Sequence, residues 1–297
     1  MRSIAERVAG APTSWGLCEV PGWGVQLAPD RVLPEMSSLG ITATEAGPDG
    51  YLGDDATSIG ALLDRYDLRL IGGFLPVVLH DPAARAATMA TAQRTATRFE
   101  ALGASFLVSA LVLDVDWSAP RLLSRSEWKT VYDGFSRLDE LAHDHGLTHV
   151  LHPHWGTLAE RRDEVWRTLE DSEVLFCLDT GHLALGETDP VEFAQAAGSR
   201  IAHAHLKDVS EEIAGRLRTG AIGLVPAVQE GLFQPLGDGD APVAGTVRAL
   251  EAAGYDGWYV LEQDISLSAD EVAPEQGATR NVRRSIEFLQ ALEGGLA

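Results

Sequence analysis

The chain has 297 residues, 45% of them hydrophobic and 23% charged, which is the balance of an ordinary soluble globular protein. Its 23 Lys and Arg against 44 Asp and Glu give a net charge of −21, which disfavours nucleic acids and anionic membrane surfaces as partners. We expect neither a signal peptide nor a membrane helix, which needs roughly 20 apolar residues. Only Cys18 and Cys177 are present, so a disulfide framework is excluded and a reducing, cytoplasmic location is expected.

Short apolar segments alternate with segments of helical periodicity along the chain. In the first half, strands are predicted at residues 8–14, 41–46, 68–74 (extended to 79) and 105–110, and helices at 29–39, 56–66, 82–102 and 127–145. In the second half, strands are predicted at 148–151, 174–179, 200–205 and 257–262, and helices at 158–171, from 190, at 241–253 and at 270–292. Asp189 followed by Pro190 predicts the capped start of one of these helices.

This alternation predicts the fold class. Strands that alternate with helices pair in parallel, because each crossover needs about a dozen or more residues. Eight such units without a break in composition predict an α/β fold, a single (β/α)8 TIM barrel over residues 1–297. The segment 207–239 is an unusually long connection, and we expect a loop that either closes over the barrel mouth or contacts another subunit.

The stretch 174–190 carries the first sign of a functional site. It begins with a continuous apolar run, typical of a strand buried on both faces, which ends abruptly in Asp179-Thr180-Gly181-His182. A carboxylate and a histidine around a glycine turn fit a site at the carboxyl edge of a parallel barrel. The alternative is structural: Asp179 caps the next helix and His182 packs locally.

Polar side chains also end most of the other strands, and a barrel brings these ends to one face. Six of the 9 histidines belong to this set. Histidines mixed with carboxylates, without thiolates, suit one divalent ion such as Mn, Co, Zn or Mg. The candidates are Glu45, His80, His152, His154, Asp179, His182, His203, His205 and Glu262.

Two tryptophans and three histidines are harder to place. Trp15 and Trp155 follow the first and fifth predicted strands, where an aromatic plane covers the apolar face of a sugar ring or simply packs in the core or at the rim. The remaining histidines, His143, His145 and His149, belong to the opposite face, and we leave them out of the site.

Three motifs occur in order on the last three predicted strands: Cys177-Leu178-Asp179-Thr180-Gly181-His182, His203-Ala204-His205-Leu206-Lys207-Asp208 and Leu261-Glu262. They resemble the xylose-isomerase-like TIM-barrel superfamily, which includes ketose epimerases, sugar isomerases, endonuclease IV and inosose dehydratase. The resemblance covers nearly the whole chain. It implies that Asp179, His205 and Glu262 ligate a divalent metal and that His182 contacts the substrate.

The fifth strand departs from the epimerases of this superfamily, which have a glutamate there as a ligand and as one of two opposed bases. The corresponding residue here is His152, which ligates a metal but cannot be half of a carboxylate pair. The runs 151–157 and 235–239, together with the Asp-Thr-Gly-His and His-Leu-Lys-Asp motifs, resemble the inosose dehydratases and their close relatives. We therefore expect His152 as the fourth ligand.

The narrower resemblance implies a lyase that removes water from a keto-inositol or related polyhydroxy ketone through a metal-stabilised enediolate. Glu262 or a neighbouring histidine is the expected base. The expected acid is one of His154, His182 and Lys207. We expect the substrate to contact Trp15, Glu45, His80 and His203.

Other classes of function stay open at this point. A ketose isomerase or epimerase uses the same metal and the same enediolate, and differs in where the proton returns. An endonuclease-IV-like repair enzyme is disfavoured by the acidic charge and the lack of a basic stripe. A barrel that only binds a sugar is disfavoured by the number of acid–base groups. The sequence does not fix the metal, the sugar, or whether the chain forms a homo-oligomer.

Overall fold

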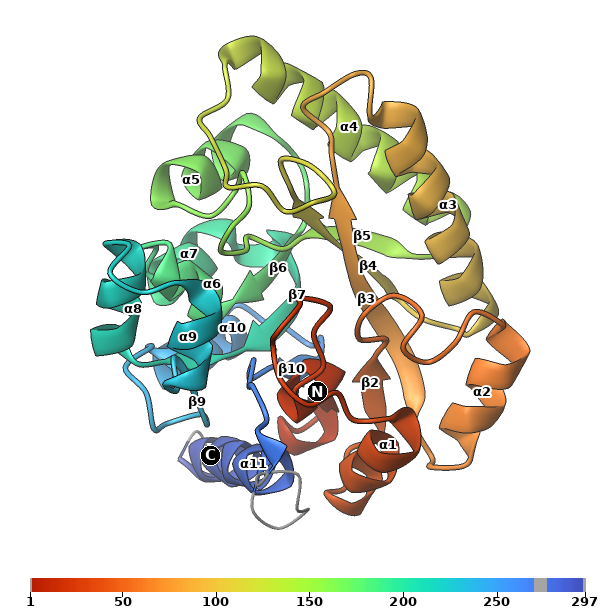
Figure 1. Cartoon of the computed structure of the whole chain (residues 1–297), viewed down its shortest axis with the longest axis vertical. Helices are drawn as coiled ribbons and strands as arrows, with labels where there is room; N and C mark the ends of the chain where they lie inside the picture. Colours follow the sequence, from red (N-terminus) through yellow and green to blue (C-terminus); the bar gives the residue numbers. More distant parts are fainter. Residues whose placement is uncertain (1, 270–276, 296–297) are drawn as a thin grey trace.

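Eight parallel strands close into a barrel in the computed structural model, which describes residues 2–269 and 277–295 (Figure 1). The strands are β1 (Val8–Gly10), β2 (Ala43–Glu45), β3 (Arg69–Val77), β4 (Phe106–Leu111), β5 (Thr148–Leu151), β6 (Phe176–Asp179), β7 (Ile201–Leu206) and β10 (Tyr259–Leu261). They follow each other in this order around the barrel, and β10 pairs with β1 to close it. The predicted (β/α)8 barrel is confirmed, and every strand overlaps its predicted range.

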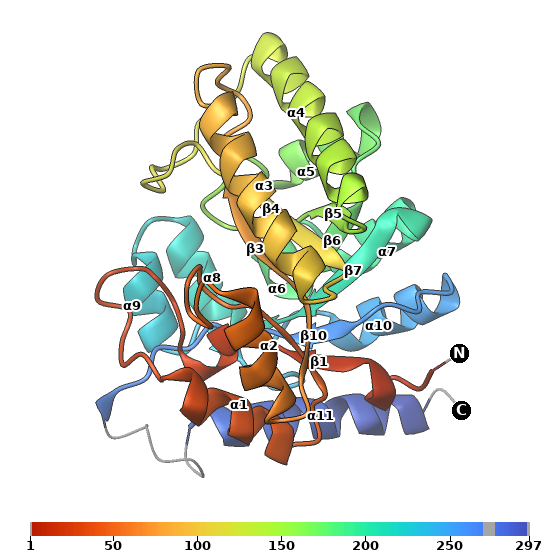
Figure 2. The ribbon, with the colours of Figure 1, turned by 90° about the vertical axis from the view of Figure 1, so that its right-hand side faces the viewer.

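Helices surround the barrel, and both views show α3 and α4 side by side along one flank (Figures 1 and 2). The helices are α1 (Pro29–Ser38), α2 (Ala56–Asp64), α3 (Arg85–Ala101), α4 (Arg125–Asp144), α5 (Arg162–Asp171), α6 (Thr180–Leu185), α7 (Pro190–Ala197), α10 (Val243–Ala252) and α11 (Ala278–Gly294), with short 3-10 helices at Ala5–Arg7, Pro12–Trp15 and Gly198–Arg200. The predicted cap is confirmed, since Asp189 accepts hydrogen bonds at the start of α7. No helix of the described part is long and apolar enough to cross a membrane.

Alternation along the strands decides which side chains reach the barrel interior. In β6, Phe176 and Leu178 belong to the large apolar cluster between the strands and the helices. Cys177 instead packs with valines of β4 and β5 inside the barrel. Asp179 follows Cys177 by two residues and so shares its inward direction, at the carboxyl end of the strand. The sequence pattern of β6 thus delivers a carboxylate to the barrel mouth.

The connection 207–239 is not the loop that we expected. It contains β8 (Asp208–Val209), α8 (Glu211–Arg218), α9 (Leu224–Gln229) and β9 (Phe233–Gln234), and β8 pairs antiparallel with β9. Apolar residues of this excursion, among them Leu217, Val228 and Leu232, form a small second core together with Trp23 and Leu185. At its base the buried Asp208 carboxylate accepts backbone hydrogen bonds from residues 237, 239 and 241.

The last helix lies against the first residues of the chain (Figure 2). Glu293 near the end of α11 accepts a hydrogen bond of 2.8 Å from the backbone N–H of Ile4. The helix begins at Ala278, and the part of the predicted closing helix at 270–276 lies outside the described residues.

Candidate functional site

Four side chains from four strands meet at the mouth of the barrel. They are His152 directly after β5, Asp179 at the end of β6, His205 in β7 and Glu262 directly after β10. One ligand atom of each lies within 4.8 Å of the others. His152 Nε2 is 3.4 Å from Asp179 Oδ2, and His205 Nδ1 is 2.8 Å from Glu262 Oε2. The structure brings together the four residues that were predicted as metal ligands.

The chemistry of this cluster fits a divalent ion. Within the described part of the chain, His152 Nε2 and Asp179 Oδ2 are buried without a hydrogen-bond partner. A buried polar atom is normally satisfied by some partner, and a cation between these two atoms would satisfy both of them. Burial lowers the pKa of His152, which keeps its imidazole neutral and a lone pair free. Two imidazoles and two carboxylates are suitable ligands for Zn, Mn or Co.

The two oxygens of Asp179 have different tasks. Oδ1 accepts hydrogen bonds of 2.8 Å from the backbone N–H groups of Gly181 and His182, and so caps α6. This orientation leaves Oδ2 facing His152 and His205. The helix-cap alternative is therefore correct for one oxygen, while the other has the position predicted for a ligand. The expected glycine turn is in fact the first turn of α6.

The Asp-Thr-Gly-His and His-Leu-Lys-Asp motifs are joined by hydrogen bonds and close packing. The Thr180 hydroxyl donates to the backbone oxygen of Lys207 at 2.7 Å and accepts from its N–H at 2.9 Å. Gly181 leaves room for the lysine stem, because a Cβ at this position would lie 2.6 Å from Lys207 Cγ. His182 Nε2 is 3.0 Å from Lys207 Nζ. The two motifs together bury a lysine beside the cluster.

Lys207 is 1% exposed and has three carboxylates around its ammonium group. Nζ lies 2.7 Å from Asp264 Oδ2, 3.3 Å from Glu262 Oε2 and 3.6 Å from Asp179 Oδ2. Burial lowers the pKa of Lys207, but the carboxylates outweigh burial and raise the pKa above its usual value. Asp264 was not among the predicted residues. The signal for it was its spacing of two from Glu262, since such side chains share one side of an extended segment.

A second polar layer lies beneath the cluster. Glu45 Oε1 is 2.7 Å from His203 Nε2 and 3.0 Å from His205 Nε2, and all three side chains are buried. Burial raises the pKa of Glu45, but the charge of His205 and the hydrogen bonds from both histidines outweigh burial and lower the pKa to about 2. The predicted substrate contacts of Glu45 and His203 do not match this placement, because both side chains face His205 from below.

An aromatic wall flanks the other side of the cluster. The Trp117 ring stacks on Phe74 with a centroid distance of 6.0 Å, and His154 lies 5.6 Å from Phe74 and 3.8 Å from His182. Trp117 is 36% exposed and has a left-handed backbone, with φ of 55°. Burial, with the charges of His152 and Lys207, lowers the pKa of His154 to about 3. No pattern in the sequence pointed to Phe74 or Trp117.

Trp15 does not contact the site, and the prediction that it binds substrate is wrong. The 3-10 helix Pro12–Trp15 turns its side chain into the core, where it is 0% exposed. Its indole N–H donates to Glu35 in α1 at 2.9 Å. Trp155 does lie beside the site, since its backbone N–H donates to His182 Nδ1 at 3.4 Å.

His80 is also placed away from the cluster, against the prediction. β3 ends at Val77, and the loop that follows turns His80 toward the connection between β4 and α4. Burial lowers the pKa of His80, and the charged groups that act on it include Arg121 and Glu127 rather than members of the cluster. His149, which we left out of the site, lies between β5 and α4, where it bonds to Ser109 and to Asp139.

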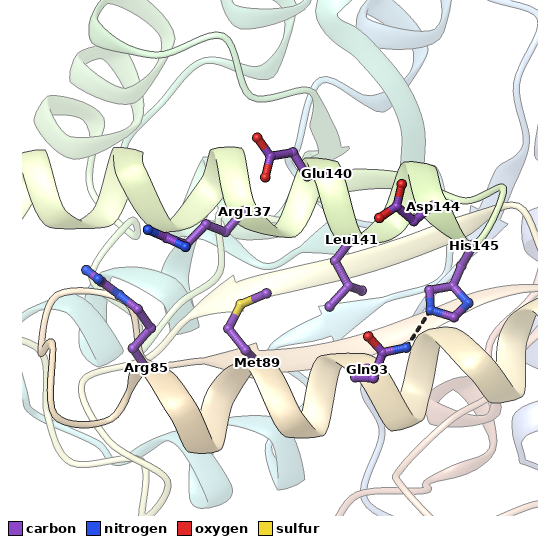
Figure 3. A pocket seen from close by; sticks show the side chains of 8 residues that line it. All are labelled: Arg85, Met89, Gln93, Arg137, Glu140, Leu141, Asp144 and His145. Atoms are coloured by element: carbon purple, nitrogen blue, oxygen red, sulfur yellow. Dashed lines mark hydrogen bonds between the residues drawn. The ribbon is translucent and has the colours of Figure 1, made fainter.

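A hollow of about 280 Å³ lies between α3 and α4 in the outer helix layer, and none of the four predicted ligands lines it (Figure 3). Its lining residues are Arg85, Met89, Gln93, Arg137, Glu140, Leu141, Asp144 and His145. None of these was predicted for the site, and His145 was assigned to the opposite face.

Known proteins resemble this chain over most of its length. Residues 33–292 match the family model described as "Xylose isomerase-like TIM barrel". An inosose dehydratase of Geobacillus kaustophilus is 30% identical over 270 residues, which cover 87% of each chain. The rhizopine catabolism protein MocC of Rhizobium meliloti is 29% identical over 268 residues, 87% of this chain and 81% of the relative.

Solved structures share the fold at low sequence identity. The IOLI protein, solved "with a binding zinc atom", has a TM-score of 0.70 at 12% identity, over 97% of this chain and 98% of its own. A D-allulose 3-epimerase from Methylomonas sp. has a TM-score of 0.69 at 18% identity, over 96% of each chain. From the family model and the inosose dehydratase relative together, this chain belongs to the xylose isomerase-like TIM barrel family.

Proposed function

We propose that this protein is a divalent-metal-dependent inosose dehydratase, a hydro-lyase acting on a keto-inositol or a related polyhydroxy ketone. The observation that carries the proposal is the cluster of two histidines and two carboxylates with a buried lysine at its side. The relatives named inosose dehydratase support the choice of substrate class. The substrate is a small polyol, and the reducing cytoplasm is the proposed location.

The metal ligands in this proposal are His152, Asp179, His205 and Glu262. When bound, a divalent ion polarises the substrate carbonyl and stabilises the negative charge that develops as the α-proton leaves. The same residues accept Mn, Co, Zn or Mg, and metal analysis of the purified protein identifies which one is bound.

Loss of water needs a base for the α-proton and an acid for the departing β-hydroxyl. The Glu262 side chain is 12% exposed, whereas that of Asp179 is 0% exposed, so Glu262 is the carboxylate that faces the substrate. We assign the base role to Glu262. Lys207 is the cation of the site, held by three carboxylates, and we assign it to the departing hydroxyl. His154 and His182 bind further hydroxyl groups.

Phe74 and Trp117 give the site one apolar side. A cyclitol has a face of C–H groups that packs against aromatic rings, as apolar surface generally does. We therefore place the ring of the substrate against these two side chains, with its hydroxyl groups toward His154 and Lys207.

The alternative reaction is that of a ketose isomerase or epimerase, which would use the same ligands. Returning a proton to the opposite face needs a second base there, as in the carboxylate pair of the related epimerases. The fifth strand supplies His152 instead, which has no hydrogen-bond partner among the described residues and fits the ion. This difference favours loss of water.

The test compares two substrates. Metal-loaded protein is incubated separately with 2-keto-myo-inositol and with a ketose, and the products are followed by mass spectrometry and NMR. We expect loss of one water from the keto-inositol and no change of the ketose. Inversion of a ketose carbon without loss of water would replace the proposed function by that of an epimerase.

Glu262→Gln is expected to slow the exchange of the substrate α-proton with D2O by about 10²–10⁴-fold, because the base is removed. The exchange is measured by NMR with the metal content of the variant determined in parallel. Glu170→Gln, an exposed exchange on α5, is the matched control. Retained exchange in a metal-loaded Glu262→Gln protein would move the base role to a histidine.

Glu45→Gln is expected to weaken metal binding by about 10–100-fold, although Glu45 itself is not a predicted ligand. The Glu45 carboxylate accepts from His205 Nε2 and thereby directs Nδ1 toward Glu262 and the cluster. The measurement is isothermal titration of the metal-free protein with Mn²⁺ or Zn²⁺. An unchanged affinity would mean that packing alone orients His205.

A further inference from the structure

Three carboxylate groups surround the single ammonium group of Lys207. Asp264 is its nearest carboxylate at 2.7 Å, and Glu262 and Asp179 follow at 3.3 and 3.6 Å. The latter two are ligands in the proposed function. An ammonium group at this distance competes with a metal ion for the same oxygens. A further interaction is therefore needed to orient the Lys207 ammonium group.

The backbone and stem of Lys207 are held in place, so its ammonium group is the part that can exchange partners. The Thr180 hydroxyl makes two hydrogen bonds to the Lys207 backbone. The lysine stem packs closely against Gly181, where a Cβ would lie 2.6 Å from Lys207 Cγ. Nζ also lies 5.1 Å from the centre of the Phe233 ring. With the stem fixed, a small rotation at its end carries Nζ either toward Asp264 or toward the ligand carboxylates.

Asp264 lies on the mouth side of the lysine. Its side chain is 17% exposed, against 1% for Lys207 and 12% for Glu262. It follows the end of β10 by three residues, so the barrel strand sets the position of its backbone. From this geometry we propose, resting on the proposed function, that Asp264 is a positioning residue. It draws the Lys207 ammonium group off the ligand carboxylates and toward the substrate.

This role predicts a coupling between two substitutions. In Asp264→Asn, Nζ moves toward Glu262 and Asp179 and competes with the ion, so metal affinity falls by about tenfold or more. In a Lys207→Met background the same Asp264→Asn exchange has little effect, because no ammonium group remains to compete. The four proteins form a double-mutant cycle, measured by isothermal titration with Mn²⁺ or Zn²⁺ and without substrate.

A simple charge effect gives a different result. If Asp264 only adds negative charge near the ion, Asp264→Asn weakens binding by the same factor with or without Lys207, and the proposal is overturned. Asp264→Glu keeps the charge and is expected to restore most of the affinity. Asp163→Asn, an exposed exchange on α5, is the matched control, and thermal unfolding verifies that all variants are folded.

The outcomes separate this proposal from the proposed function. A wild-type protein that binds metal but does not dehydrate the keto-inositol overturns the reaction, while the cycle still decides the role of Asp264. A wild-type protein that binds no divalent ion overturns the metal site and this proposal together. Where dehydration is observed, we expect Asp264→Asn to lower kcat at saturating metal with little change in KM, since Lys207 acts on the departing group.

Discussion

Replacing Asp179 and His205 by alanine is expected to remove the divalent ion and to lower dehydratase activity by at least about a thousandfold. The two side chains come from neighbouring strands, and the remaining His152 and Glu262 are too few to hold a divalent ion in a four-ligand site. A thousandfold loss corresponds to about 4 kcal/mol of transition-state stabilisation, which is in the range that a Lewis-acid ion supplies.

The measurement is metal content by mass spectrometry together with the keto-inositol assay. About one ion per wild-type chain, lost from the Asp179→Ala, His205→Ala protein, is the expected result. The matched control is Asp163→Ala with His143→Ala, two exposed side chains on α5 and α4. Two or three zinc ions per wild-type chain would point to a nuclease-like centre, and no ion in either protein would remove the basis of the mechanism.

Arg7→Met is expected to lower the free energy of unfolding by about 3 kcal/mol, because it removes a fully buried guanidinium and leaves the half-buried Glu251 carboxylate without its cation. Arg7 is 0% exposed, and its guanidinium donates to Glu251 at 2.6 Å and to the backbone oxygen of Tyr255 at 3.0 Å. The Tyr259 hydroxyl donates to the same Glu251 oxygen at 2.6 Å. These contacts join the start of β1 to α10 and β10, at the seam where the barrel closes.

Chemical denaturation measures this effect. Adding Glu251→Leu to Arg7→Met is expected to recover a large part of the lost stability, since the unpaired charge is then removed as well. Arg65→Met is the matched control, because Arg65 is 63% exposed and its pair with Asp30 spans 3.6 Å. We expect less than about 1 kcal/mol for it. Equal effects of Arg7→Met and Arg65→Met would contradict the role given to burial.

The fold and the placement of the candidate residues at strand ends followed from the sequence for one physical reason, whereas the choice of four ligands among them came from the family resemblance. Strands buried on both faces are continuous apolar runs, so a polar residue that ends such a run marks the mouth of the barrel. Asp179 and Glu262 stand at these positions. His205 was placed by its motif, and its inward direction follows from the period of two along β7.

The errors lie where this regularity stops. Trp15 and His80 follow their strands by several residues, and the direction of a side chain in an irregular segment depends on tertiary packing. The 3-10 helix turns Trp15 inward, and the loop after β3 carries His80 toward α4. Glu45 points into the barrel as expected, but the neighbouring histidines enclose it, which no pattern along a single strand reveals.

The segment between β7 and α10 was misjudged for another reason. Its apolar residues are spread over two short helices, each too short for helical periodicity to distinguish it from a loop. Trp117 was missed because it lies in a connection without a recognisable pattern, and Asp264 because its spacing of two from Glu262 was not used, although both flank the site in the structure.

Asp208 has a consequence for how this protein can change. Its carboxylate accepts backbone hydrogen bonds from residues 237, 239 and 241. The two ends of the segment that contains α8 and α9 therefore lie next to each other. Doubling the length of such a closed loop costs only about 0.6 kcal/mol in closure entropy. Insertions at the turn between α8 and α9, residues 219–223, are therefore expected to leave Lys207 in place, because they avoid Phe233, whose ring lies 5.1 Å from Lys207 Nζ. The fold thus offers a grafting site beside its reactive centre, where new specificity can evolve without rebuilding the barrel.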